Sequence, residues 1–213
     1  MKSPYYEADG ITLYHGDCLE IDAWLGGDVL VTDPPYGIAW SNPEYNGGRA
    51  HAGIAGDETT EARDRALTLW GLDRPAVVFG DPRHPVPGAK TTLAYVKPPD
   101  AGLFGAVAGF RRDWEPVYLV GAFPRQPAAR SGVLRTGLRA AGGLRHDHPH
   151  IKPLDVMETL IEAMPPGTVV DPFAGSGSTL LAARNQGRTA IGVEIEERYC
   201  ETIASRLAQG LLL

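Results

Sequence analysis

Cysteine and long apolar runs are both scarce in this sequence of 213 residues. Cys18 and Cys200 are the only cysteines. They predict reduced thiols in a cytosolic protein, and a Cys18–Cys200 disulfide is the alternative. The sequence lacks the ligand spacings of a zinc site. No apolar run approaches the roughly 20 residues that cross a bilayer. Residues 1–7 contain no apolar signal core. We therefore expect a cytoplasmic protein without membrane contact.

Positive charge is also in deficit, since the formal net charge is −6. Phosphate contacts need cations, so this balance argues mildly against a nucleic-acid binder. The distribution is uneven, however. Between Arg125 and Lys152 the basic residues are opposed by Asp147 alone, whereas acids gather in residues 57–64 and 194–201. This segment predicts one basic face that meets phosphate, and a solvated arginine-bearing loop is the alternative.

The pattern of apolar residues predicts a single α/β domain over residues 1–213. Apolar runs that indicate strands alternate with segments of helical spacing. Strands are expected at 11–14, 28–32, 76–79, 92–96, 117–120, 168–170 and 189–193, and helices at 59–72, 103–110, 153–164, 180–186 and 196–207. Strands 92–96 and 117–120 are expected to pair antiparallel. Residues 121–147 lose this pattern and read as a short basic insertion.

The turn Asp33-Pro34-Pro35-Tyr36 directly follows the apolar run 29–31 and looks like a site. Two prolines end the strand at once, because neither has an N–H for a sheet ladder. A carboxylate and a proline carbonyl can each accept one hydrogen of a nucleobase amine, which localises the nitrogen lone pair, while a tyrosine ring can stack on the base. A plain proline-stiffened turn is the alternative.

A second candidate site is the glycine-rich turn at residues 171–179, which separates an expected strand from an expected helix. Glycines let a ligand approach the backbone closely, and the following helix offers free N–H groups. Glu194 ends the next expected strand, where a carboxylate suits two ribose hydroxyls. The turn has only two glycines, which fits the nucleoside of S-adenosyl-L-methionine at least as well as a pyrophosphate.

Taken together, the two turns resemble the DNA amino-methyltransferases, which methylate N6 of adenine or N4 of cytosine. Their order, with the catalytic turn first, is similar to the permuted β class. The stretch 148–153 resembles the His-Pro-x-x-Lys-Pro segment of that family, and Gly16-Asp17 also falls in a family position. The resemblance spans about residues 11–208. It implies a seven-stranded, mostly parallel Rossmann-like sheet in circularly permuted order, with helices on both faces and the two chain ends adjacent.

The resemblance also implies roles for individual residues. Asp33 would hold the target amine together with the carbonyl of Pro34, with that of Pro35 as a further candidate, and Tyr36 would stack on the flipped base. No metal is implied, and S-adenosyl-L-methionine would be the cofactor. Its methionine part would lie against Phe173, Gly175 and Gly177, near Asp171, and its ribose on Glu194. Its adenine would meet Asp17 and the Cys18 backbone. The remaining candidates for this pocket are Ser176, Thr179 and Lys152.

The implied activity is methylation of adenine N6 in double-stranded DNA, since a catalytic turn with aspartate at position 33 resembles that of the adenine enzymes. Candidate DNA contacts are Arg125, Arg130, Arg135 and Arg139. A second copy of the chain is a further candidate partner. The alternatives are a cytosine-N4 or RNA-directed enzyme of the same class, an NAD-linked oxidoreductase that uses the glycine turn, and a non-catalytic DNA-binding protein. The segment available for reading a DNA sequence is short, which predicts limited or partner-assisted recognition.

Overall fold

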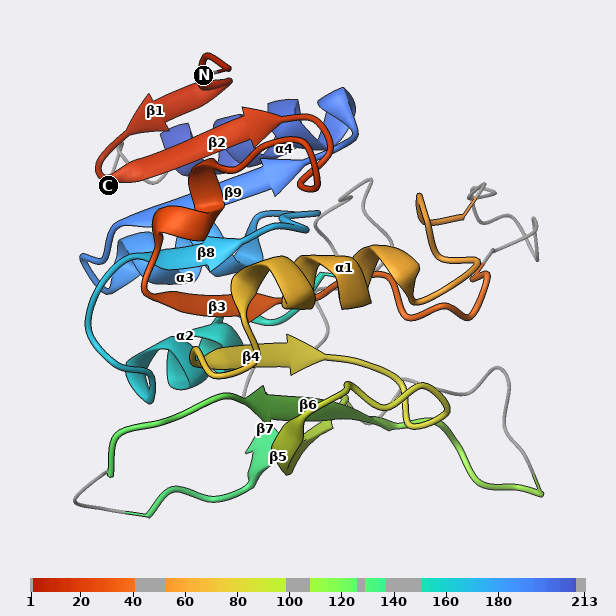
Figure 1. The fold of residues 1–213 in the computed structure, drawn as a ribbon. Coiled ribbons are helices and arrows are strands. Elements are labelled where there is room, and N and C mark those ends of the chain that lie inside the picture. The colour runs from red at the N-terminus through yellow and green to blue at the C-terminus, as the bar shows by residue number, and fades with distance from the viewer. Residues whose placement is uncertain (1, 41–52, 99–107, 126–128, 137–150, 210–213) are drawn as a thin grey trace.

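The computed structural model describes residues 2–40, 53–98, 108–125, 129–136 and 151–209. It contains one 9-stranded sheet in the order β1-β2-β9-β8-β3-β4-β6-β5-β7 (Figure 1). The strands are β1 (Tyr6–Ala8), β2 (Ile11–His15), β3 (Val29–Thr32), β4 (Ala76–Phe79), β5 (Ala89–Val96), β6 (Trp114–Val120), β7 (Val133–Arg135), β8 (Val169–Asp171) and β9 (Ala190–Glu194). The helices are the 3-10 turn η1 (Ala23–Gly26), α1 (Glu61–Trp70), α2 (Leu154–Glu162), α3 (Ser178–Asn185) and α4 (Glu197–Gln209).

Most strands of the sheet point in one direction. β2, β9, β8, β3 and β4 pair parallel in succession. β6 is antiparallel to β5, as expected, and also to β4, so β5 points the same way as β4. β7 is parallel to β5. The carboxyl ends of β2, β9, β8, β3, β4, β5 and β7 therefore share one side of the sheet, here called the carboxyl edge. Ligands of α/β proteins bind at such an edge.

The permuted order is confirmed by the strand register. β2 pairs with β9, with Ile11 opposite Ala190. β8 lies between β9 and β3, and Val29 pairs with Val169. The first and last segments of the chain are thus neighbours in the sheet. As a consequence, the turn after β3 and the turn after β8 emerge side by side.

Helices cover both faces of the sheet, as expected (Figure 1). α2, α3 and α4 share one apolar cluster, and η1 and α1 contribute to the cluster on the other face. In the second cluster the indole of Trp24 stacks on that of Trp70 with ring centroids 6.1 Å apart. The central strands β3 and β4 are buried at every position, which is typical of parallel strands covered on both faces.

Two strands were not predicted, and the expected count of seven is wrong. β1 and β7 are three residues each, too short for a pattern of alternation, and they form because neighbouring strands offer unpaired edges. β1 adds to β2, and β7 adds to β5. Residues 103–107 of one predicted helix lie outside the described residues. At its end, Ala108 and Gly109 have positive φ angles and form a turn.

Cys18 and Cys200 are both buried and free, so the prediction of thiols rather than a disulfide is confirmed. Among the described helices, none is long and apolar enough for a membrane crossing.

Candidate active site

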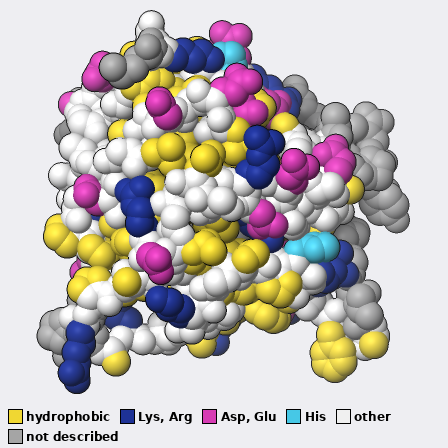
Figure 2. Space-filling model, in the orientation of Figure 1, with side chains coloured by type: hydrophobic (Ala, Val, Ile, Leu, Met, Phe, Trp, Pro, Cys, Tyr) yellow, Lys and Arg dark blue, Asp and Glu magenta, His cyan; other side chains and the backbone are white. Residues whose placement is uncertain are grey.

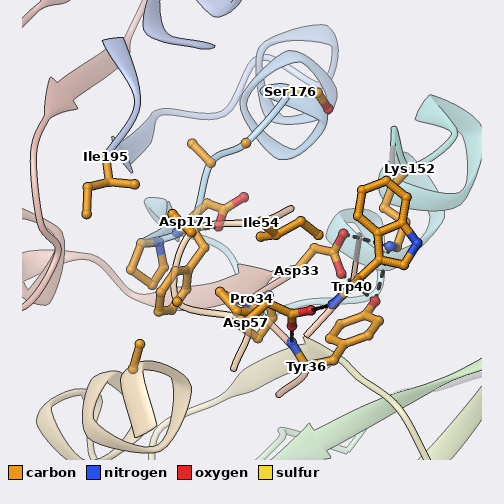
Figure 3. A pocket seen from close by; sticks show the side chains of 18 of the residues that line it. Asp33, Pro34, Tyr36, Trp40, Ile54, Asp57, Lys152, Asp171, Ser176 and Ile195 are labelled. Carbon is orange, nitrogen blue, oxygen red and sulfur yellow. Dashed lines mark hydrogen bonds and ion pairs between the residues drawn. The ribbon is translucent and has the colours of Figure 1, made fainter. Parts of the chain in front are cut away.

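A cavity of about 830 Å³ opens at the carboxyl edge, within the size range of small-molecule sites. The turn after β3, the glycine turn after β8 and the end of β9 all contribute to its wall. Every catalytic and cofactor residue predicted from the sequence lines it, except Gly177. Figure 3 shows Lys152, Asp33 and Tyr36 toward one side of this cavity and Ile195 at the other.

The turn after β3 is held in place by a buried carboxylate, that of Asp57. Its Oδ1 accepts the backbone N–H groups of Tyr36 and Gly37 at 2.7 and 3.0 Å, and its Oδ2 accepts that of Trp40 at 2.8 Å (Figure 3). Only 2% of Asp57 is exposed. Three partly buried backbone donors thus share one acceptor group.

Gly37 is required by this arrangement. Its φ angle is +74°, a conformation that residues with a Cβ rarely adopt. A Cβ at this position would also lie 2.9 Å from the backbone of Thr59, just before α1. The turn therefore packs tightly against the start of the helix that follows in the chain.

Asp33 itself lies in a network of charged and hydroxyl groups. Its Oδ2 is 2.6 Å from Nζ of Lys152, and its Oδ1 accepts the hydroxyl of Tyr36 at 2.6 Å. Nζ of Lys152 also lies 3.3 Å from the carboxylate of Glu115, which pairs with Lys97 at 2.7 Å. Two carboxylates and two ammonium groups thus compensate one another, as partly buried ions require.

The pKa values reflect this pairing. Burial alone would lower the pKa of Lys152, but the carboxylates of Asp33 and Glu115 outweigh burial and raise it. Burial would raise the pKa of Glu115, but Lys152 and Lys97 hold it below its usual value. The pKa of Tyr36 is well above its ordinary value because the ring is desolvated and faces Asp33 and Glu115. Lys152 and Tyr36 therefore stay protonated at neutral pH.

The glycine turn is organised by Glu194. Its Oε2 accepts the backbone N–H of Gly175 at 2.7 Å, and its Oε1 accepts that of Glu196, just before α4, at 2.8 Å. A carboxylate offers about four acceptor positions, so two remain for a ligand. Gly177 has a φ of +78°, and a Cβ there would lie 2.9 Å from Ile203 of α4. Its role is to let the turn close against this helix.

Asp171 joins the two turns directly. Its Oδ1 accepts the hydroxyl of Thr32, the last residue of β3, at 2.6 Å and the N–H of Phe173 at 3.1 Å. Burial raises the pKa of Asp171 to about 6, although hydrogen bonds from Thr179, Thr32 and Phe173 oppose the shift. Burial likewise raises the pKa of Glu194 to about 7, against its two backbone hydrogen bonds.

Asp17 and Cys18 lie between β2 and η1, on the glycine-turn side of the cavity. Oδ1 of Asp17 accepts the N–H of Leu19 at 2.8 Å, and the carbonyl of Cys18 accepts the indole N–H of Trp24 at 2.9 Å. Lys152, a candidate for the cofactor pocket, also lines the cavity, and its ammonium group lies against Asp33 and Glu115.

Several residues at the site were missed by the sequence analysis, above all Asp57 and Glu115. Asp57 is separated from the turn it holds by twenty residues of irregular sequence, and no local pattern marks it. Glu115 carries a faint signal, because it is an acid near the start of an otherwise apolar strand. Trp40 and Ile54 also line the cavity and add apolar surface near Asp33.

The predicted DNA-contacting arginines do not gather at the cavity. Arg135 ends β7 at the carboxyl edge, whereas Arg130 precedes that strand and therefore lies toward the opposite edge. The guanidinium of Arg130 pairs with Glu162 at the end of α2, 3.0 Å away. Arg125 follows β6, whose chain direction also leads away from the cavity (Figure 1). Arg139 lies outside the described residues.

Comparisons with known proteins agree with this geometry. A family model described as DNA methylase, N6_N4_Mtase, matches residues 114–205. The Escherichia coli (strain K12) protein named "Putative methylase YubD" is 32% identical over 217 residues, covering 91% of this chain and 88% of that protein. The M1.HpyAVI-SAM complex is 25% identical with a TM-score of 0.64, covering 92% of this chain and 98% of that chain. PvuII DNA methyltransferase, titled cytosine-N4-specific, shares the fold at 17% identity and a TM-score of 0.70, covering 95% and 88% of the two chains.

With this fold, site and set of relatives, the chain belongs to the DNA amino-methyltransferases, whose members methylate N6 of adenine or N4 of cytosine. S-adenosyl-L-methionine is the methyl donor of this family. Membership of this family argues against the alternative that the chain is an NAD-linked oxidoreductase.

Asp57 provides a test of how the catalytic turn is held. In Asp57→Ala the three N–H groups lose their acceptor, and each unpaired buried donor costs about 1–3 kcal/mol. We expect the free energy of unfolding in urea to fall by roughly 3 kcal/mol. Asp57→Asn should also lose activity, because its NH₂ would face one of the three N–H donors. Asp28→Asn is the matched control, since Asp28 accepts the N–H of Thr168 away from the cavity. Equal stability and turnover of Asp57→Asn and the native protein would contradict this role.

Proposed function

We propose that this protein transfers a methyl group to the exocyclic N6 of an adenine in double-stranded DNA, with the base swung out of the duplex into the cavity. The observation that carries the proposal is the position of Asp33. Its carboxylate lies in the same cavity as the glycine turn and Glu194, and both of its oxygens are oriented, by Lys152 and by Tyr36. An amine acceptor and a nucleoside-binding turn therefore share one enclosed space.

The proposed role of Asp33 is to polarise the target amine. The nitrogen lone pair of an exocyclic amine is delocalised into the ring, which makes the amine a poor nucleophile. A carboxylate that accepts one N–H, with the Pro34 carbonyl accepting the other, draws the nitrogen toward a tetrahedral geometry. Preorganised acceptors of this kind need no rearrangement during the reaction. The two hydrogen bonds on Asp33 fix its carboxylate and still leave acceptor positions for the amine.

The residues of the glycine turn fit S-adenosyl-L-methionine. Two acceptor positions of the Glu194 carboxylate remain after its backbone bonds, which suits the paired hydroxyls of a ribose. Phe173, Gly175 and Ser176 line the cavity beside it, with Asp17 and Cys18 on the β2 side. When bound, this donor supplies an electrophilic methyl group on a sulfonium sulfur. The protein contributes position, exclusion of water and polarisation of the amine.

In this proposal the carboxylate of Asp33, which holds the amine, also accepts the proton that the amine must lose when it gains a methyl group. Lys152 is not a base here, because the neighbouring carboxylates raise its pKa. Tyr36 is likewise protonated at neutral pH, since its pKa is raised. The proton therefore passes to Asp33 and from there to water at the cavity mouth. Tyr36 and Trp40 are the candidates for stacking on the base.

Cytosine N4 is the second candidate target. It presents an exocyclic amine with the same two N–H groups, and the matched family includes enzymes for both bases. Aspartate at position 33 favours adenine, because the turn then resembles that of the adenine enzymes rather than the serine-containing turn of many cytosine-N4 enzymes.

Substitution of Asp33 tests the mechanism. Asp33→Ala should lower the rate of methyl transfer by at least about 100-fold, the scale of a lost acid–base or polarising group. Binding of S-adenosyl-L-homocysteine, measured by calorimetry, should change little, because the glycine turn is intact. Mass analysis of nucleosides from DNA treated with the native protein should show N6-methyl-2′-deoxyadenosine. Methylation of DNA by Asp33→Ala at the native rate would contradict the mechanism, and N4-methylcytosine or methylated RNA as the product would reassign the substrate.

Glu194 gives a prediction about pH. Its carboxyl group accepts ribose hydroxyls best when ionised, and its pKa of about 7 lies above the usual value. Affinity for S-adenosyl-L-homocysteine should therefore rise between pH 6.5 and pH 8, as Glu194 loses its proton. Glu194→Gln should bind more weakly and show no such rise. The measurement is calorimetry at several pH values, and a native affinity that is constant or falls over this interval would count against ribose binding by Glu194.

A further inference from the structure

A basic and aromatic rim borders the cavity on the side away from the glycine turn. It consists of Arg111, Arg112 and Trp114, and all three line the cavity. They immediately precede or begin β6, which is antiparallel to β4 and so starts at the carboxyl edge. In Figure 1 the light-green chain reaches β6 from this side, and Figure 2 shows hydrophobic side chains that project in the same corner.

The two cations of the rim are exposed. Arg112 forms no ion pair with any residue in the described part of the chain, although it exerts a Coulombic effect on the carboxyl of Asp81, which pairs with Arg83 at 2.8 Å. Arg111 lies 3.9 Å from Asp113, and both side chains are well exposed. Exposed ion pairs contribute little to stability, and their exposure leaves both guanidinium groups accessible to a phosphate. By contrast, Lys97 deeper in the cavity is engaged by Glu115 at 2.7 Å.

The rim also exposes aromatic surface that would normally be buried. Trp114 is 45% exposed, and the nearby Phe110 is 81% exposed. An exposed indole beside arginines at a cavity mouth matches the way proteins bind unstacked nucleic acid, where bases stack on aromatic rings and cations follow the backbone. A base that enters the cavity leaves its neighbours unstacked at the mouth, where this indole lies.

We propose that the rim is the surface that grips double-stranded DNA beside the flipped base, with Arg112 and Arg111 on its phosphates and Trp114 against an unstacked neighbouring base. This inference rests on the proposed function and goes beyond it by assigning the contact. It also separates the rim from Arg130, whose guanidinium pairs with Glu162 toward the opposite edge of the sheet. Arg111 and Arg112, which precede the basic insertion, thus line the cavity, whereas Arg130 within the insertion does not.

Salt dependence of DNA binding tests the phosphate contacts. The affinity of the full-length protein for a duplex is measured at several salt concentrations with S-adenosyl-L-homocysteine present. Arg112→Gln should reduce the slope of log affinity against log salt by about one, and Arg111→Gln with Arg112→Gln by about two. Arg130→Gln is the matched control and should leave the slope unchanged. Calorimetric binding of S-adenosyl-L-homocysteine should be the same in all variants, which verifies folding.

Trp114 is tested separately. Trp114→Ala should weaken duplex binding by roughly tenfold, and Trp114→Phe should retain most of the affinity because the ring is kept. An unchanged slope in the Arg111/Arg112 double variant, or a reduced slope in Arg130→Gln alone, would overturn the proposal and move the DNA to the other edge. If the native protein methylates DNA in that case, only this inference fails. If the native protein neither binds nor methylates DNA, the proposed function fails with it.

Discussion

The pairing of β3 with β8 is the constraint on which the active site depends. These strands lie far apart in the sequence, yet their register places Val29 opposite Val169. The hydrogen bond from Thr32 to Asp171, at 2.6 Å, then joins the two strand ends at the point where both turns begin. A slip of one residue in a strand would turn every side chain to the other face. The distance between the turn after β3 and the glycine turn is therefore set by the core of the sheet, not by the loops.

Carboxylates arranged around this pairing have different tasks. Asp57 and Glu194 each accept backbone N–H groups and so give their turns a shape. Asp33, the residue proposed to polarise the amine, pairs with Lys152, whose ammonium group also lies beside Glu115. Buried charges are costly unless they are paired, so the network must be complete for any of its members to be tolerated. This interdependence explains why Asp33 and Glu115, from separate segments of the chain, converge on Lys152.

The sequence predicted the sheet class, most strands and the two turns, because each rests on local signals: apolar runs, paired prolines, glycines and a following acid. It missed β7, which forms only because β5 offers an edge, and it missed Asp57 and Glu115, whose partners are distant in the chain. It also grouped Arg130 and Arg135 as contacts of the DNA substrate, although both line a second, smaller pocket beside α2, separate from the cavity at the carboxyl edge. A basic stretch in a sequence does not show which of its members lies near the active site.

In the proposed function, one cavity holds the methyl donor on the glycine turn with its reactive end toward Asp33. The decisive measurement is a crystal structure of the protein with S-adenosyl-L-homocysteine. We expect the ribose hydroxyls on the carboxylate of Glu194 and the sulfur directed toward Asp33 and Pro34. A molecule bound away from Gly175, or one whose sulfur points away from Asp33, would contradict it.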